Sequence, residues 1–129
     1  MLTDVPLTDE QRFIWESSAR FARERVAPDA AKRDREHRFP FDLVSELAQL
    51  GLLGVKVPVD QGGSGADMTS YVLAISEIAR ACASTAVTMA VSNLVADILS
   101  RFASTTRANK MWKLACVPLV IHCLEPLST

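Results

Sequence analysis

The first apolar pattern begins after Thr8 and predicts an amphipathic helix. Its apolar positions repeat at the helical period of 3.6 residues and are Trp15, Ala19, Ala22 and Val26. Thr8 and Gln11 have the spacing of a capping box, in which each side chain binds the backbone amide of the other residue. Pro28 cannot donate a helical hydrogen bond, so we expect the helix to end or kink there.

A charged stretch and a second apolar stripe follow. Residues 29–38 carry charges of both signs in alternation, which favours a solvated helical face over a binding arm. Pro40 suits the first turn of the next helix. The apolar stripe of that helix is Leu43, Val44, Leu47 and Leu50. Gly51 is well placed as its left-handed stop.

Residues 52–67 predict a long irregular segment that contains a tight turn at Gly62-Gly63-Ser64-Gly65. A phosphate-binding loop would need a Walker lysine or the Rossmann glycine spacing after a strand, and neither is present. Asp67 can cap a further helix. The apolar positions of that helix are Tyr71, Ile75, Ile78 and Cys82.

Residues 86–102, after a break at Ser84-Thr85, predict a helix that is apolar most of the way round. Such a helix is normally buried on all sides, and the other predicted helices are too few to enclose it. We therefore expect a partner surface from another domain or chain, including a second copy in a homo-oligomer. The apolar run 85–99 is too short, and with Ser92, Asn93 and Asp97 too polar, for a membrane span.

The end of the chain predicts one more helix and a strand-like tail. A helix can begin at Thr105 or Thr106 and end near Ala115, before Pro118. Residues 119–124 are rich in β-branched side chains, as a strand is, but no second strand is evident to pair with them. The predicted fold is therefore all-α, a bundle of about five to six helices with a short C-terminal strand-like tail.

Composition narrows the class of protein. The 129 residues are 49% hydrophobic and 22% charged, which is typical of one globular domain. A net charge of −1 argues against nucleic acid or an anionic membrane as partner. The three cysteines form no CxxC or Cys/His cluster, and the N-terminus has neither a secretory signal nor transit-peptide character. We therefore expect reduced thiols and a cytoplasmic protein.

Few residues look catalytic on their own. The two histidines, His37 and His122, are isolated, and no nucleophile triad or HExxH motif is present. Glu125 is the carboxylate of the apolar tail, where it is expected to be solvated. The residues alone therefore predict a helical domain with a hydrophobic face that its own helices do not cover. They predict no metal ligands and no catalytic residue.

Five local strings, in this order and spacing, resemble the acyl-CoA dehydrogenase family. They are Leu7–Gln11, Val26–Pro28, Phe39-Pro40 with Leu47–Gly54, Val57-Pro58 with Gly62–Gly65, and Glu77–Ser84. The resemblance covers about residues 7–104 and continues more weakly through Lys110–Cys116 and Cys123–Pro126. It implies that residues 1–117 are an N-terminal helical domain and residues 118–129 the start of a truncated flavin-binding β domain.

The family resemblance implies an FAD-dependent oxidoreductase that acts on CH–CH bonds of fatty-acid metabolism. Family members remove the α-proton of an acyl-CoA thioester with a glutamate and pass hydride from the β-carbon to FAD, giving trans-2-enoyl-CoA. That glutamate belongs to the C-terminal part of the family fold, and this sequence has no matching position. The expected partners are acyl-CoA and, for the apolar helix 86–102, a homo-oligomer or a partner domain or chain.

The resemblance also implies site residues. Val87, Ala90, Val91 and Leu94 would lie beside the acyl chain, with ordinary core packing as the alternative for each; His122 and Leu124 match positions that approach the flavin. We therefore expect the chain to supply only the N-terminal domain that lines the acyl pocket, and to be inactive alone. The alternatives are one chain of a split dehydrogenase and a non-catalytic helical interaction module.

Overall fold

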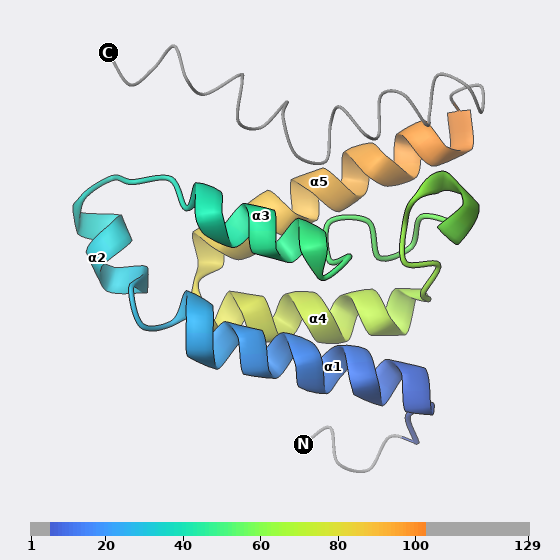
Figure 1. The fold of residues 1–129 in the computed structure, drawn as a ribbon, viewed down its shortest axis with the longest axis horizontal. Coiled ribbons are helices and arrows are strands. Elements are labelled where there is room, and N and C mark those ends of the chain that lie inside the picture. Colours follow the sequence, from blue (N-terminus) through green and yellow to red (C-terminus); the bar gives the residue numbers. More distant parts are fainter. Residues whose placement is uncertain (1–5, 103–129) are drawn as a thin grey trace.

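The computed structural model describes residues 6–102, and in this range the chain is helical without strands. The α-helices are α1 (Asp9–Phe21), α2 (Ala30–Arg35), α3 (Phe41–Gln49), α4 (Met68–Ala81) and α5 (Ala83–Phe102), arranged as in Figure 1. A π-helical segment, Ala22–Val26, continues α1, and a 3₁₀ turn, Val59–Gln61, interrupts the loop before α4. The predicted all-α class is confirmed. The predicted helix at 105–115, the tail at 119–124 and the boundary at 117 lie outside the described residues.

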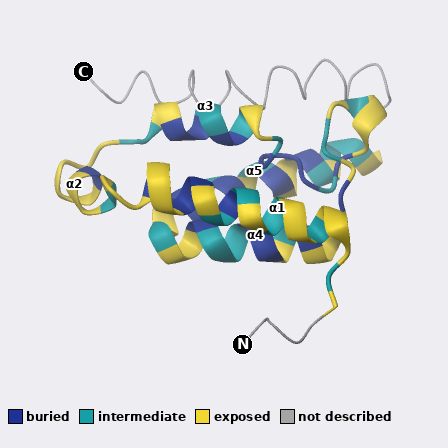
Figure 2. Ribbon diagram, turned by 60° about the horizontal axis from the view of Figure 1, so that its bottom comes forward, coloured by how far each residue is buried: buried dark blue, intermediate teal, exposed yellow. Residues whose placement is uncertain are grey.

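The core lies where α1, α3 and α5 meet α4 and the loop after α3. Helices α1 and α4 lie side by side along most of their length, and α5 packs against α4 and α3. Figure 2 shows the buried residues on the sides of the helices that face one another. The largest apolar side chains of this core that are fully buried are Val26, Leu47, Leu53, Val55, Ile78 and Met89.

The predicted capping box at the start of α1 is confirmed. The Gln11 amide donates to Thr8 Oγ1 at 3.2 Å, and the Thr8 amide donates to Gln11 Oε1 at 3.0 Å. Gln11 Nε2 also donates to Asp67 Oδ2 at 2.6 Å, and Asp67 Oδ1 caps α4 by accepting the Ser70 amide at 2.8 Å. The hydrogen bonds from Ser70 and Gln11 hold the pKa of Asp67 below its usual range. The two cap side chains therefore join the starts of α1 and α4.

The charged stretch is solvated as predicted, except at Arg33. The Arg33 residue is only 8% exposed, and its Nη2 donates to the carbonyl oxygen of Val26 at 2.7 Å. That carbonyl lies in the last turn of the helix that ends before Pro28. No later backbone amide is in position to donate a hydrogen bond to it. Arg33 is thus a buried cation in α2 and not part of the solvated face.

The glycine predictions hold where a left-handed backbone is required. Gly51 ends α3 with φ of 73°, and the loop glycines Gly62 and Gly65 have φ of 94° and 64°. At Gly63 the reason is close approach, because a Cβ there would collide with the backbone of Val57. The tight turn predicted from the Gly-Gly-Ser-Gly string is therefore present, and it folds back onto the chain before it.

The break between α4 and α5 lies at Cys82, and the predicted break at Ser84-Thr85 is wrong. Cys82 alone is extended, with φ of −161° and ψ of 113°, and α5 begins at Ala83. Thr85 is fully buried inside the first turn of α5. Ser84 and Thr85, which were expected to interrupt the helical pattern, instead lie in the first turn of α5. Ser and Thr are favoured at the start of a helix.

Helix α5 is 20 residues long, so it extends beyond the apolar run 85–99 and has the length to cross a membrane. Its composition is also apolar enough for a span. A single helix of this kind is a weak indication, because core helices of globular proteins pass the same test. Here Asn93 and Asp97 tie the helix to the loop after α3.

The Asn93 amide is the main polar link between α5 and that loop. Its Oδ1 accepts the Val55 amide at 2.9 Å, and its Nδ2 donates to the Leu52 carbonyl oxygen at 2.8 Å and to the Met89 carbonyl oxygen at 2.9 Å. The side chain is buried and all of these contacts are buried too. A buried amide with its hydrogen bonds satisfied on both ends fixes the register between the two segments.

We predict that Asn93→Ala lowers the free energy of unfolding by about 3 kcal/mol, because the Val55 amide and the Leu52 carbonyl would stay buried without partners. Ser92→Ala is the matched control, since Ser92 Oγ only donates to the Thr88 carbonyl within the helix; a change of less than about 0.5 kcal/mol is expected. Urea unfolding followed by circular dichroism measures both. Equal losses in the two variants would contradict the role given to Asn93.

Candidate functional site

One side of α5 is apolar and exposed along its whole length. Its large exposed side chains are Val87, Val91, Leu94, Val95, Ile98 and Phe102, here called the α5 outer face. The opposite side of the same helix is buried and carries Thr85, Ala86, Met89, Asn93 and Ala96. A contiguous apolar surface of this kind on a small domain is typical of a ligand or partner contact.

The four residues predicted to line an acyl pocket share this side of α5. Val87, Val91 and Leu94 are 62%, 55% and 59% exposed, and Ala90 is half-buried between them. Their spacing of three and four residues puts them on adjacent turns of one face. Within residues 6–102, the side chains of Val87, Val91 and Leu94 lie on the surface and outside the core.

Contacts on the inner side hold this face in place. Besides the Asn93 hydrogen bonds, Lys56 Nζ lies 3.4 Å from Asp97 Oδ2 and 5.8 Å from the centre of the Tyr71 ring. Asp97 also accepts from Arg101 Nε at 3.1 Å. The Lys56 and Asp97 side chains are largely buried, so solvent screens this pair less than a surface pair. The helix that carries the α5 outer face is therefore fixed to the loop after α3 and to α4.

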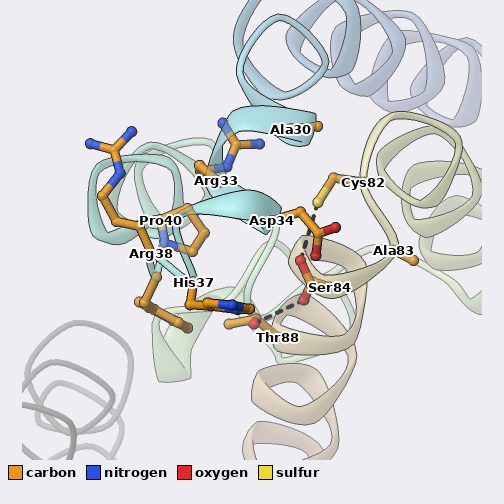
Figure 3. A pocket seen from close by; sticks show the side chains of 11 residues that line it. Ala30, Arg33, Asp34, His37, Arg38, Pro40, Cys82, Ala83, Ser84 and Thr88 are labelled. Carbon is orange, nitrogen blue, oxygen red and sulfur yellow. Dashed lines mark hydrogen bonds between the residues drawn. The ribbon is translucent and has the colours of Figure 1, made fainter. Parts of the chain in front are cut away.

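A second feature lies at the start of α5, where Figure 3 shows a pocket between α2 and the α4–α5 joint. Its volume is about 560 Å³, and its lining includes Arg33, Asp34, His37, Cys82 and Ser84. Cys82 Sγ lies 3.2 Å from Ser84 Oγ. Partial burial raises the pKa of the Cys82 thiol, but hydrogen bonds from Ser84, Thr85 and Arg33 outweigh it and lower the pKa to about 7.

Sequence reasoning missed this pocket. It assigned Cys82 to the apolar repeat of α4 and placed Arg33 in a solvated run. The available signal was the hydroxyl pair Ser84-Thr85 directly after the cysteine, which is the pattern of a helix start. The contact between α2 and the start of α5 is tertiary, so the spacing of residues along the chain does not predict it.

The predicted flavin contacts, His122 and Leu124, lie outside the described residues. Within residues 6–102, no three His, Cys, Asp or Glu side chains converge in a way that could hold a metal ion. The outer-face side chains Val87, Val91, Leu94, Val95, Ile98 and Phe102 carry no hydrogen-bond donor for a diphosphate. This surface fits an alkyl chain, but it does not fit a dinucleotide such as FAD.

Comparison with known proteins decides the family. The family described as "Acyl-CoA dehydrogenase, N-terminal domain" matches residues 8–114. The chain belongs to the acyl-CoA dehydrogenase family. The match includes helices α1 to α5 of the described part of the chain, and it confirms the resemblance seen in the sequence.

Curated relatives of this family are much longer than the chain. It is 46% identical over 92 residues to the benzylmalonyl-CoA dehydrogenase of Aromatoleum aromaticum, a match that covers 71% of this chain and 24% of the relative. It is 42% identical over 89 residues to the mouse mitochondrial short-chain specific acyl-CoA dehydrogenase, with 69% and 22% covered. The chain therefore spans about a quarter of the length of these relatives.

Solved structures of the family share the helical arrangement. The butyryl-CoA dehydrogenase of Megasphaera elsdenii matches with a TM-score of 0.79 and 29% identity, covering 88% of this chain and 31% of that one. A chain in the structure reported for the electron transferring flavoprotein of Acidaminococcus fermentans matches with a TM-score of 0.80 and 28% identity, covering 88% and 30%. The all-α fold of this chain is thus shared by the matched part of both solved chains.

We predict that the purified chain self-associates or binds a hydrophobic dye, because the α5 outer face is apolar and uncovered. The double substitution Val87→Ser with Val91→Ser should reduce dye fluorescence and the sedimentation coefficient together. Met68→Ser with Val72→Ser removes two exposed apolar side chains at the same spacing on α4, and should change neither. A wild-type chain that sediments as a monomer and binds no dye would contradict this prediction.

Proposed function

We propose that this chain provides the N-terminal helical domain of an FAD-dependent acyl-CoA dehydrogenase and that its α5 outer face packs against the acyl group of the substrate. The proposed reaction is α,β-desaturation of an acyl-CoA thioester to trans-2-enoyl-CoA. The observation that carries the proposal is the exposed apolar row Val87, Val91 and Leu94 on a helix whose other side is anchored in the domain. The family membership of residues 8–114 supports the reaction class.

The chemistry of the α5 outer face suits an alkyl chain. Val87, Ala90, Val91 and Leu94 offer no donor or acceptor, so they can bind methylene groups only by dispersion and by removal of water. Two of the four side chains are β-branched and have restricted rotamers, so ordering them costs little entropy. In this role the face would orient the acyl chain and exclude water beside it.

FAD would accept the hydride in the proposed reaction, and the residues that hold it would lie outside the α5 outer face. No step of the chemistry is assigned to residues 6–102, because none of their carboxylates lies on that face. We therefore propose that the chain is inactive alone and works with flavin-binding and base-bearing domains. His122 and Leu124 remain proposed flavin contacts from the family resemblance.

The test supplies those domains in trans. The full chain is co-expressed with the middle and C-terminal parts of the mouse short-chain relative, and enoyl-CoA formation from butyryl-CoA is measured with an artificial electron acceptor. Supplying the mouse N-terminal segment in the same way is the positive control. Activity restored by the mouse segment but not by this chain would overturn the proposal and favour the non-catalytic module.

In that assay we predict that Val91→Asp lowers kcat/KM at least about 30-fold, because a carboxylate against the alkyl chain costs about 2 kcal/mol or more. Val72→Asp is the matched control, since Val72 is an equally exposed valine within α4. It should leave kcat/KM within about 2-fold. Equal effects of the two substitutions would contradict the proposal that the α5 outer face lines the acyl pocket.

A second measurement concerns the chain by itself. We predict that the purified full chain shows no stoichiometric flavin absorbance and no dehydrogenation of butyryl-CoA, because the α5 outer face offers no donors for the diphosphate of FAD. A yellow protein with one FAD per chain would contradict the proposed division of labour between domains.

A further inference from the structure

The exposed side of α5 repeats with the spacing of a coiled-coil seam. Val87, Val91, Leu94 and Ile98 follow one another at intervals of four, three and four residues, and all four are exposed. In a heptad, this spacing gives the two core positions, a and d, through which the side chains of paired helices interdigitate. The α5 outer face therefore has the pattern of a helix that can pair with one other helix.

The two ends of this seam decide how a second copy of α5 would align with it. One position further on each side, the seam reaches Ser84 and Arg101, which are both exposed. Parallel alignment would bring Arg101 against the Arg101 of the second copy, and these like charges would repel. Antiparallel alignment puts Arg101 opposite Ser84 and keeps the two guanidinium groups roughly 25 Å apart along the axis. The apolar pairs in this alignment are Val87 with Ile98 and Val91 with Leu94.

The same antiparallel alignment brings Phe102 to the pocket at the start of the other α5. Phe102 is 82% exposed, and it follows Ser84 by 18 residues, or five helical turns, so both lie along one edge of the helix. Ser84 and Thr88 line the pocket of about 560 Å³ in Figure 3, together with Ala83. In a twofold antiparallel pair the same edges of the two helices meet, and Phe102 reaches the level of Ala83. Phe102 of each copy therefore faces the pocket of the other.

The lining of this pocket suits an aromatic ring. Phe39 and Pro40 supply apolar surface, and Arg38 and His37 also belong to the lining. A guanidinium group is attracted to the face of an aromatic ring within about 6 Å. The pocket is also large enough, because a cavity of about 150 Å³ already holds benzene. Phe102 of a second copy would thus find both the apolar contacts and the cation that its ring favours.

The area of the α5 outer face is close to what a specific dimer needs. Its six large apolar side chains are between 43% and 82% exposed. Together they expose roughly 600 Å² per copy, so pairing would bury about 1,200 Å², which is the lower limit for specific interfaces. An interface of this size gives a reversible complex, and we expect a dissociation constant in the micromolar range.

We propose that the α5 outer face is an interface at which two copies of this chain pair antiparallel, with Phe102 of each copy inserted into the pocket at the start of the other α5. The pairing does not rest on the function proposed above, but the two uses of the face exclude each other. A paired chain covers Val87, Val91 and Leu94, so it cannot place them against an acyl group. The dimer is therefore a form of the chain that must dissociate before the domain can line an acyl pocket.

The first experiment is analytical ultracentrifugation of the full chain from about 1 μM to about 1 mM, which brackets the expected dissociation constant. We expect a transition from monomer to dimer and no larger species. Phe102→Ala should weaken the dimer at least about 10-fold, because each pocket loses the ring that fills it. Phe13→Ala is the matched control, since Phe13 is a similarly exposed phenylalanine on α1. It should change the dissociation constant by less than about 2-fold.

Three outcomes of this experiment would overturn the proposal. A chain that stays monomeric throughout would leave the α5 outer face to another domain of the enzyme. Growth into larger species would contradict a closed twofold pair. Equal effects of Phe102→Ala and Phe13→Ala would show that Phe102 makes no specific contact in the dimer.

The second experiment tests whether Phe102 enters the pocket. Ala83→Trp places a large side chain at the exposed rim of the pocket, so it should weaken the dimer about as much as Phe102→Ala does. Within one chain these two residues lie at opposite ends of α5, so they can interact only across the dimer. The double variant should therefore be little weaker than either single variant. Additive losses would mean that Phe102 does not occupy the pocket, and would overturn the proposal.

The third experiment tests the orientation by disulfide crosslinking. Two chains, in which serine replaces Cys82, Cys116 and Cys123, carry either Val87→Cys or Ile98→Cys. The mixture should give a linked heterodimer, because these positions face each other in the antiparallel pair. Neither chain should link to itself, since its two thiol positions would lie roughly 16 Å apart along the axis, beyond the reach of about 7 Å between Cα atoms.

Linked homodimers without a heterodimer would indicate parallel pairing and overturn the proposal. If the serine replacements prevent folding, the comparison of Phe102→Ala, Ala83→Trp and their double variant decides alone, because parallel pairing would hold Phe102 and the pocket at opposite ends of the dimer.

Discussion

Asn93 places a side-chain amide inside the otherwise apolar contact between α5 and the loop after α3. The loop needs this amide, because residues 52–57 form no helix or strand, and the Val55 amide and the Leu52 carbonyl would otherwise be buried without partners. The same amide fixes which side of α5 faces inward. A helix with apolar residues most of the way round has no strong rotational preference of its own. The hydrogen bonds to Val55 and Leu52 supply that rotational preference. They therefore determine which side chains of α5 form the α5 outer face.

The turn at Gly62-Gly63-Ser64-Gly65 also supports the loop that Asn93 binds. Ser64 Oγ donates to the Gly51 carbonyl at 2.9 Å, and the Gly65 and Ala66 amides donate to the Val57 and Val55 carbonyls at 2.8 Å. The loop thus folds back on itself and covers the end of α3 before α4 begins. Without that turn, the segment that Asn93 binds would have no second support. The family string of glycines therefore serves the placement of α5.

Apart from the break at Ser84-Thr85, the local signals were read correctly from the sequence, and the tertiary contacts were not. The Thr8–Gln11 cap, the Asp67 cap and the left-handed Gly51 depend on neighbours within a few residues, so spacing alone predicts them. Asn93 was read only as a polar interruption, because its partners lie about 40 residues earlier in the chain. The four residues expected to line an acyl pocket were named from the family resemblance, and the structure adds that three of them are exposed.

Arg33 illustrates why charge patterning misleads at a helix junction. In the sequence it is one of many charges in a row, and nothing distinguishes it from Lys32 or Arg35. In the fold the π-helical end of α1 leaves the Val26 carbonyl without an amide, and Arg33 is the side chain of α2 that reaches it. That contact draws a cation into the protein beside Cys82. The lining of the pocket at the start of α5 therefore depends on how α1 ends, more than 50 residues earlier in the chain.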